Sequence, residues 1–305
     1  MTYNPKNIAT KLTELSDNMK LINGDVPYYY FPHLDDTKVV KSAFSTRLGG
    51  VSDGVLGTLN LGTNRGDEPE NLKENFKRIA TAIGTLPDNM VLSHQTHTTN
   101  VKVITKEDMG NGIVKDNEFT DIDGMITNES GITLVTSYAD CVPLYFVDPV
   151  KKVIGLSHSG WRGTVNMMGL HTVNKMVEVY DCDPKDILGA IGPSICQGCY
   201  EISEDVAVEF IDKFTDLEKE FSDIKKLSSL YKYEESKIVY HRQDNKEKYQ
   251  LNLWRANELI MLKAGLKPEN IRCANICTCE HPDVFFSHRA SNGERGNVCA
   301  FLTLL

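Results

Sequence analysis

Three residues that could bind a metal ion stand at the edges of predicted strands. Cys141 lies between two short apolar runs, His158 follows a third run, and His97 lies upstream in the segment SHQTHTTNV. Cysteine thiolate and neutral imidazole are ligands that zinc favours, and a catalytic zinc ion typically has three protein ligands and one open position for water. The three residues are therefore a candidate zinc site, which only folding could assemble. Structural histidines and a buried, inert cysteine are the alternative.

Neighbouring polar residues could orient such ligands. Asp123 is one of two carboxylates on a short extended segment, where residues two apart point to the same side. It could orient a metal-bound histidine, although turn chemistry is the simpler explanation for aspartate beside glycine. Asp140 precedes Cys141, and His94 lies three residues before His97. We treat Asp123, Asp140 and His94 as candidate supporting residues.

A glycine-rich segment, STRLGGVSDGVLGTLNLG, is a candidate anion site. Glycine lets backbone amides approach an anion closely, and an arginine adds a permanent, fork-shaped donor. A turn-rich connection with a surface arginine is the alternative. A second arginine follows the tryptophan after His158, and a third lies near the C-terminus, where an ordinary ion pair would also explain it. The candidate contacts to phosphate or substrate are Arg47, Gly49, Gly50, Asn60, Arg162 and Arg289.

Several motifs in one order resemble those of the YfiH-like laccase-domain family. They are STRLGGVS at 45–52, LNLG at 59–62, QTH at 95–97, ADCVP at 139–143, HSGWRGT at 158–164, IGPSICQGCYEI at 191–202 and FFSHRASNGERGNVCAFLTL at 285–304. The family is also called multicopper polyphenol oxidase-like, and its members are described as zinc-dependent purine nucleoside phosphorylases with adenosine deaminase activity. The resemblance runs from about Phe44 to the C-terminus and implies that His97, Cys141 and His158 are the metal ligands.

The resemblance also implies a reaction. Adenosine, inosine or methylthioadenosine would react with phosphate to give free base and ribose 1-phosphate, with nucleoside and phosphate as the small-molecule partners. Cys141, His158 and Arg162 would be the catalytic residues. A zinc ion lowers the pKa of bound water to roughly 7, which suits deamination of adenine. Phosphorolysis needs an anion pocket in addition.

Three other functions use the same residues differently. Without metal, Cys141 as nucleophile and His158 as base would make a cysteine hydrolase. With copper, which we favour less than zinc as the cofactor, two histidines and a cysteine resemble a blue-copper site. A multicopper oxidase needs many more histidines, whereas the chain has eight, scattered and without any H-x-H pair. A non-catalytic interaction protein would not require cysteine, histidine, arginine and glycine to gather at strand ends.

Composition excludes some partners. The chain has 305 residues, 41% hydrophobic and 25% charged, which suits a globular protein with a large core. A net charge of −9 and a pI near 5.4 leave no basic field for a nucleic acid polymer or an anionic membrane. No apolar stretch approaches the roughly 20 residues of a membrane helix, and the N-terminus lacks an apolar signal core. We expect a cytoplasmic protein.

The eight cysteines are expected to be reduced thiols, since no export signal accompanies them. Cys196 and Cys199 form a CxxC, and Cys277 and Cys279 form a CxC. A four-cysteine zinc site is the alternative for this group, but CxC is tighter than the usual spacing of zinc ligands. The family resemblance gives these cysteines no metal role either. A packing role is the favoured interpretation.

The elements predicted around these residues indicate one domain. Residues 1–24 form a weak helical pattern, taken as an extension before a single catalytic domain at 25–305. Pro69 to Ile83 is a predicted helix that ends at Gly84. The strands between 132 and 158 are joined by turns too short for parallel crossovers. The segment VFFSHR at 284–289 is a further predicted strand. Residues 215–248 are predicted to form a solvated helix followed by a mobile loop. We predict an α/β or α+β fold with a mixed or mainly antiparallel sheet flanked by helices.

Overall fold

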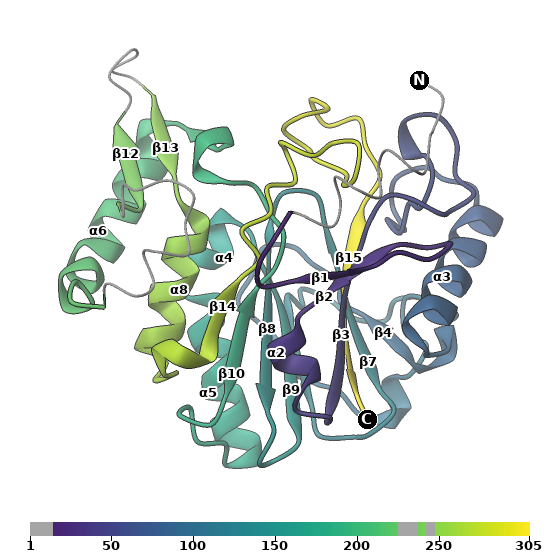
Figure 1. The fold of residues 1–305 in the computed structure, drawn as a ribbon, viewed down its shortest axis with the longest axis horizontal. Helices are drawn as coiled ribbons and strands as arrows, with labels where there is room; N and C mark the ends of the chain where they lie inside the picture. Colours follow the sequence, from purple (N-terminus) through teal and green to yellow (C-terminus); the bar gives the residue numbers. More distant parts are fainter. Residues whose placement is uncertain (1–14, 225–236, 242–247) are drawn as a thin grey trace.

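The computed structural model describes residues 15–224, 237–241 and 248–305, and two six-stranded sheets form its centre (Figure 1). The first sheet has the order β1 (Lys20–Ile22), β2 (Tyr28–Tyr30), β3 (Val40–Ser45), β15 (Val298–Leu304), β7 (Thr133–Tyr138), β4 (Met90–Leu92). The second has the order β14 (Ile271–Cys273), β10 (Leu188–Ile191), β8 (Val142–Asp148), β9 (Val153–Ser159), β6 (Gly124–Thr127), β5 (Val101–Val103). A small third sheet contains β11 (Glu201–Ile202), β13 (Tyr249–Leu251) and β12 (Val239–His241).

Helices cover the outer faces of the two large sheets. Helix α3 (Pro69–Ile83) packs on the first sheet, and α5 (Met168–Tyr180), α6 (Glu204–Glu220) and α8 (Leu253–Lys263) pack beside the second. The short helices are α2 (Pro32–Asp35) and α4 (Trp161–Val165), with 3-10 turns η1 (Gly54–Leu56), η2 (Pro87–Asn89), η3 (Lys106–Asp108), η4 (Gln197–Cys199) and η5 (Pro268–Asn270). The order of layers is helix, sheet, sheet, helices.

This layering arises because successive apolar side chains of the central strands point alternately into two different cores. In β8, Leu144 and Phe146 belong to the core under α5 and α8, whereas Tyr145 and Val147 belong to the core between the two sheets. In β15, Phe301 packs toward α3 and its neighbours pack between the sheets. Successive side chains of a strand point to opposite faces. A central strand buried on both faces is therefore mostly apolar, as these strands are apart from Asp148 and Thr303.

The predicted fold class and main helix are confirmed. The large sheets are mixed, since β4 pairs with β7, β5 with β6 and β10 with β14 in parallel, while their other pairings are antiparallel. Helix α3 has the predicted bounds and ends at Gly84, whose φ of 77° is the left-handed conformation of a helix C-terminus. The strands divide between two large sheets, however, where a single sheet was expected. The division occurs at Asp140, whose φ of 85° turns the chain out of β7 before β8 begins.

Three local predictions need correction. The helix predicted over residues 1–24 lies outside the described residues up to residue 14, and Lys20–Ile22 is a strand because it pairs with Tyr28–Tyr30. The segment 284–289 is not a strand, because Val284 and Phe285 both donate backbone hydrogen bonds to the His281 carbonyl and close a turn. In the segment 215–248, α6 continues to Glu220, and residues 225–236 and 242–247 lie outside the described residues.

No helix within the described part of the chain combines the length and apolar character needed to cross a bilayer.

Candidate active site

The chain passes from the first large sheet to the second at two neighbouring places. One passage joins β4 to β5 and carries His97, and the other joins β7 to β8 and carries Cys141. Because β4 and β7 are parallel neighbours, both passages lie at the same end of the sheets. His158 reaches this end from β9, where it pairs with Pro143 at the start of β8. The fold thus brings together three residues that are far apart in the sequence.

The side chains of these residues converge on one point. The Cys141 Sγ and the His97 Nε2 are 3.9 Å apart, and one ligand atom from each of His97, Cys141 and His158 lies within 4.8 Å of the others. Ligand atoms of a tetrahedral zinc ion are separated by roughly 3.3–3.8 Å, given bonds of about 2.0–2.3 Å. The three ligand atoms would reach this geometry by moving slightly closer together. The donor set of two imidazoles and one thiolate fits zinc with one position left open.

The buried carboxylate of Asp123 holds both histidines. Its Oδ1 accepts hydrogen bonds from the His158 Nδ1 at 2.7 Å and from the His97 backbone amide at 3.1 Å. Its Oδ2 accepts from the amides of Thr96 and Thr98, which fixes the turn in which His97 adopts a φ of 67°. The predicted supporting role of Asp123 thus has a geometric basis. With Nδ1 engaged, the Nε2 of His158 is the ring atom available to a metal.

Electrostatics favour the charged forms of Asp123 and Cys141. Burial raises the pKa of Asp123, but the hydrogen bond from His158 and those from backbone amides bring it down to about 2. Burial likewise raises the pKa of Cys141, but the His158 imidazole and a hydrogen bond with it lower the value to about 6. Burial lowers the pKa of His158, whereas Cys141 and Asp123 raise it to about 9. Cys141 is therefore a thiolate at neutral pH, the form that binds metal or attacks an electrophile.

Gly160 closes the back of this cluster, and its replacement by alanine is expected to weaken metal binding. An added Cβ would lie 2.8 Å from the His97 Cδ2 and 3.2 Å from the Cys141 Sγ, although the backbone φ of −69° accepts alanine. His97 would have to move, and we expect zinc affinity to fall about tenfold or more. Competition with a chromogenic chelator measures this.

Gly163→Ala, in the helix that begins directly after Gly160, is the matched control, since its Cβ would meet neighbours at 3.5 Å or more. Equal zinc affinities for the two variants and the unmodified protein would contradict the role assigned to Gly160.

A cavity of about 300 Å³ opens beside the cluster. Its lining includes two arginines that the sequence interpretation did not single out, Arg65 and Arg295, together with Asn297. Both arginines contact the Asn297 Oδ1, through the Arg65 Nε at 3.0 Å and through the Arg295 Nη1. The Arg295 Nε is buried and has no hydrogen-bond partner among the described residues. Burial, and then the charge of Arg65, lower the pKa of Arg295 to about 10. Two positive charges held this close would attract an anion.

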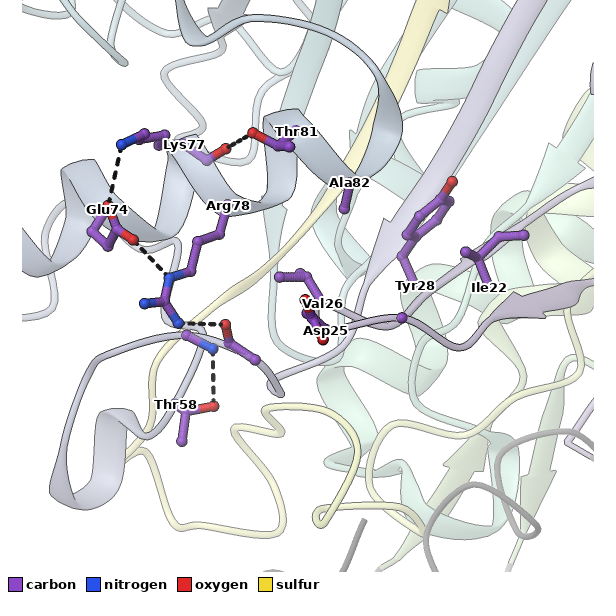
Figure 2. A pocket seen from close by; sticks show the side chains of 13 residues that line it. Ile22, Asp25, Val26, Tyr28, Thr58, Glu74, Lys77, Arg78, Thr81 and Ala82 are labelled. Carbon is purple, nitrogen blue, oxygen red and sulfur yellow. Dashed lines mark hydrogen bonds and ion pairs between the residues drawn. The ribbon is translucent and has the colours of Figure 1, made fainter. Parts of the chain in front are cut away.

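The predicted anion contacts in the glycine-rich segment lie elsewhere. Gly49 and Gly50 line a different and larger cavity, about 840 Å³, beneath α3. Figure 2 shows Arg78 in that cavity, paired with Glu74 and directed at the loop, where it donates to the Gly49 carbonyl. The Arg47 guanidinium donates to the carbonyls of Gly57 and Pro282 and lies 4.3 Å from the ring centre of Phe286. These contacts give Arg47 a structural role.

Asn60 is the exception in that segment. It is buried, and its Oδ1 accepts the backbone amide of Asn297 at 3.0 Å. It therefore supports the arginine side of the cavity from behind and does not line it.

Of the remaining predicted residues, His94 lines the cavity, and Asp140, Arg162 and Arg289 do not. His94 lines it, and its Nδ1 accepts the Asp121 amide. Asp140 is turned away from the cluster and accepts hydrogen bonds from Thr278, Ser287 and the Arg289 amide. The Arg289 guanidinium donates to the carbonyls of Cys199 and Glu201, and the exposed Arg162 stacks on Trp161. Arg162 and Arg289 thus lie outside the lining of the cavity.

Comparison with known proteins matches this arrangement to one family. The family described as multi-copper polyphenol oxidoreductase laccase matches residues 41–305. The chain is 32% identical over 304 residues to the purine nucleoside phosphorylase YlmD of Bacillus subtilis, covering 99% of this chain and 98% of that protein. The crystal structure of the hypothetical protein YfiH of Bacillus licheniformis has a TM-score of 0.81 at 26% identity, covering 95% of this chain and 100% of its own. The crystal structure of YlmD of Geobacillus stearothermophilus has a TM-score of 0.76 at 30% identity, and the match covers 91% of this chain and 96% of that one.

Proposed function

This chain belongs to the multi-copper polyphenol oxidoreductase laccase family, and from its relatives and its cavity we propose that it is a purine nucleoside phosphorylase. Its substrates would be adenosine, inosine or methylthioadenosine and phosphate, and its products free base and ribose 1-phosphate. The observation that carries the proposal is the pairing of Arg65 and Arg295 with the His97, Cys141 and His158 cluster across one cavity. The arginine side of the cavity would bind phosphate, and the cysteine and histidine side would act on the nucleoside.

The arginine side would bind phosphate. A guanidinium group offers several N–H donors in a planar fork that matches phosphate oxygens. The buried Nε of Arg295 has no partner among the described residues, so a phosphate oxygen would complete its hydrogen bonding. Asn297, tied to Ser137 through its Nδ2, keeps both arginines on this side. Phosphate would therefore be held opposite the cysteine and histidines, with the sugar between them.

The other side of the cavity would act on the nucleoside. His97, Cys141 and His158 would hold a zinc ion, with copper less favoured, and bound zinc would supply a Lewis acid for phosphorolysis and for the adenosine deaminase activity that we include in the proposal. Asp123 would keep the His158 Nδ1 protonated, so that its Nε2 faces the cavity. We place the enzyme in the cytoplasm, with nucleoside and phosphate as its partners.

One observation favours a second candidate. The lowered pKa of Cys141 and the raised pKa of His158 describe a thiolate beside an imidazolium, as in a metal-free cysteine hydrolase. Elemental analysis of protein purified without added metal separates the two. Zinc in active protein that is lost together with activity in His97→Ala supports the phosphorylase, and full activity in metal-free protein supports the hydrolase. A multicopper oxidase is not favoured, because this cluster contains two histidines within the described residues.

The reaction itself is tested with a nucleoside panel, incubated with and without phosphate. Release of free base that requires phosphate is expected, together with loss of ammonia from adenosine. Base release that is independent of phosphate would contradict the phosphorylase, and ammonia without base release would leave only the deaminase.

Arg295→Ala is expected to raise the KM for phosphate about tenfold or more, since a hydrogen bond to a charged group contributes roughly 1.5–3 kcal/mol. Initial rates at varied phosphate measure this. Arg78→Ala, in the larger cavity, is the control and should leave this KM unchanged. The opposite result, an effect of Arg78→Ala alone, would place phosphate beside the glycine-rich segment and contradict the assignment to Arg295.

A further inference from the structure

A second cluster of possible metal ligands lies outside the cavity. Cys196 and Cys199 come from the loop that follows β10, and Cys277 and Glu280 from the loop that follows β14. One ligand atom from each lies within 4.8 Å of the other three. We propose that these four side chains bind a structural zinc ion through three thiolates and one carboxylate. This site is independent of the proposed catalytic function.

The spacing of the four residues is that of a structural zinc site. Such sites use two pairs of ligands, each pair commonly separated by two to four residues. Cys196 and Cys199 form one pair with two residues between them, and Cys277 and Glu280 form the other with the same spacing. The sequence interpretation paired Cys277 with Cys279 and found the spacing too tight. The fold replaces Cys279 by Glu280 in the ligand set, which removes that objection.

Local structure assembles the four ligands without a large movement. The 3-10 turn η4 brings the two halves of the first pair together, as the Cys199 amide donates to the Cys196 carbonyl at 3.1 Å. The Cys196 amide donates to the Cys277 Sγ at 3.2 Å, and the Cys196 Sγ lies 3.6 Å from the Glu280 Oε1. A sulfur and a carboxylate oxygen bound to the same tetrahedral zinc ion are roughly 3.5–3.7 Å apart, given bonds of about 2.3 and 2.0–2.2 Å. The Cys196–Glu280 separation already matches this value, and the other ligand atoms, all within 4.8 Å of one another, would move closer around the ion.

The four side chains differ in burial, and the carboxylate is more exposed than the thiols. Cys196 and Cys277 are buried, Cys199 is half-buried and Glu280 is exposed. An ion could enter from the carboxylate side and bind sulfur in the interior, where thiolates need a compensating cation. All four nearby cysteines are free thiols.

The position of the cluster suggests what the ion would stabilise. The Thr278 hydroxyl, between two of the candidate residues, donates to the Asp140 Oδ1 at 2.6 Å. The Ile195 amide, beside Cys196, donates to the Asp140 carbonyl at 3.0 Å. A zinc ion here would join the two loops that hold Asp140, and hence the backbone of Cys141. Its role would be to stabilise one side of the active site without touching substrate.

The test is the zinc content of the full-length protein, purified under reducing conditions and measured by elemental analysis. Two zinc ions per chain are expected. His97→Ala should retain one, Cys199→Ser should retain one, and the double variant none. Replacing zinc by cobalt should give a thiolate-to-metal absorption band that is weaker in Cys199→Ser. Thermal unfolding of Cys199→Ser should no longer respond to a chelator that competes for the second site.

Two further variants keep the assignment falsifiable if Cys199→Ser fails to fold. Glu280→Gln, at an exposed position, should lower affinity for the second zinc about tenfold or more. Cys279→Ser, half-buried in the same loop, should retain both ions. The proposal is overturned by a single zinc that His97→Ala removes, or by a disulfide among these cysteines in the freshly purified protein. Loss of zinc from Cys279→Ser with retention in Glu280→Gln would overturn the ligand set.

Discussion

Replacing Cys141 by serine is expected to lower kcat/KM for phosphorolysis by more than about 100-fold and to remove the active-site zinc. A hydroxyl is a poor replacement for a thiolate that His158 already holds in its charged form, with a pKa of about 6. Losing a partner behind a ligand weakens metal affinity or activity roughly 10- to 100-fold, so losing a ligand should have a larger effect. Serine is similar in size to cysteine, and Cys141 is only partly buried, so the fold should persist. Zinc content, initial rates and circular dichroism measure the three effects.

Cys279→Ser is the matched control, since this thiol is equally half-buried and lies outside both ligand sets. Its activity should equal that of the unmodified protein. An active Cys141→Ser protein that has lost the active-site zinc would contradict the metal-dependent reaction. An inactive one that retains the active-site zinc would favour the cysteine-nucleophile hydrolase.

Asp123→Asn is expected to lower the zinc affinity of the active site about 10- to 100-fold. The carboxylate accepts hydrogen bonds from the His158 ring, from the His97 amide and from two further amides, and an asparagine must present its own NH₂ group to some of these donors. His158 would then lose the partner that fixes its Nδ1–H. Leaving buried donors unpaired costs about 1–3 kcal/mol of stability. Zinc titration and urea unfolding measure the two effects.

Asp121→Asn is the control, because Asp121 is an exposed carboxylate two residues away that accepts a hydrogen bond from the Thr96 hydroxyl. Its zinc affinity should be nearly unchanged. Equal losses in both variants would mean that any disturbance of the turn weakens the site, and the specific role of Asp123 would be wrong. The rate of phosphorolysis by Asp123→Asn at saturating zinc then shows whether activity falls because the metal is lost or because His158 is misoriented. A rate restored by zinc indicates metal loss.

Residue type and local periodicity were enough to predict part of this molecule. The apolar spacing of α3 and the glycine after Ile83 predicted its bounds correctly. The soft ligands His97, Cys141 and His158 are rare residue types placed at strand ends, and together with the family motifs they indicated one site. These features depend on residues close in sequence or on chemistry that few residue types offer.

Features that depend on long-range contacts were not predictable in the same way. Strands β7 and β8 both carry buried apolar residues on both faces, so their sequences do not show that they belong to different sheets. Arg47 resembled an anion contact because its partners, Gly57 and the distant Pro282, are not evident before folding. Arg295 gains its significance from Arg65 and Asn297, of which Arg65 is more than two hundred residues away.

The passages between the two sheets would make the affinity for the proposed metal ion depend on the interior of the protein. His97 and Cys141 each lie on a segment that leaves one sheet and joins the other, while His158 belongs to the second sheet itself. Sliding of one layer over the other would therefore alter the separation of the three donor atoms. Tyr138, on β7 of the first sheet, connects the two layers, because its ring centre is 5.5 Å from that of His158 on β9 of the second sheet. Substitutions in the layer between the sheets should consequently change how tightly the ion is held, even where no altered atom lies near it.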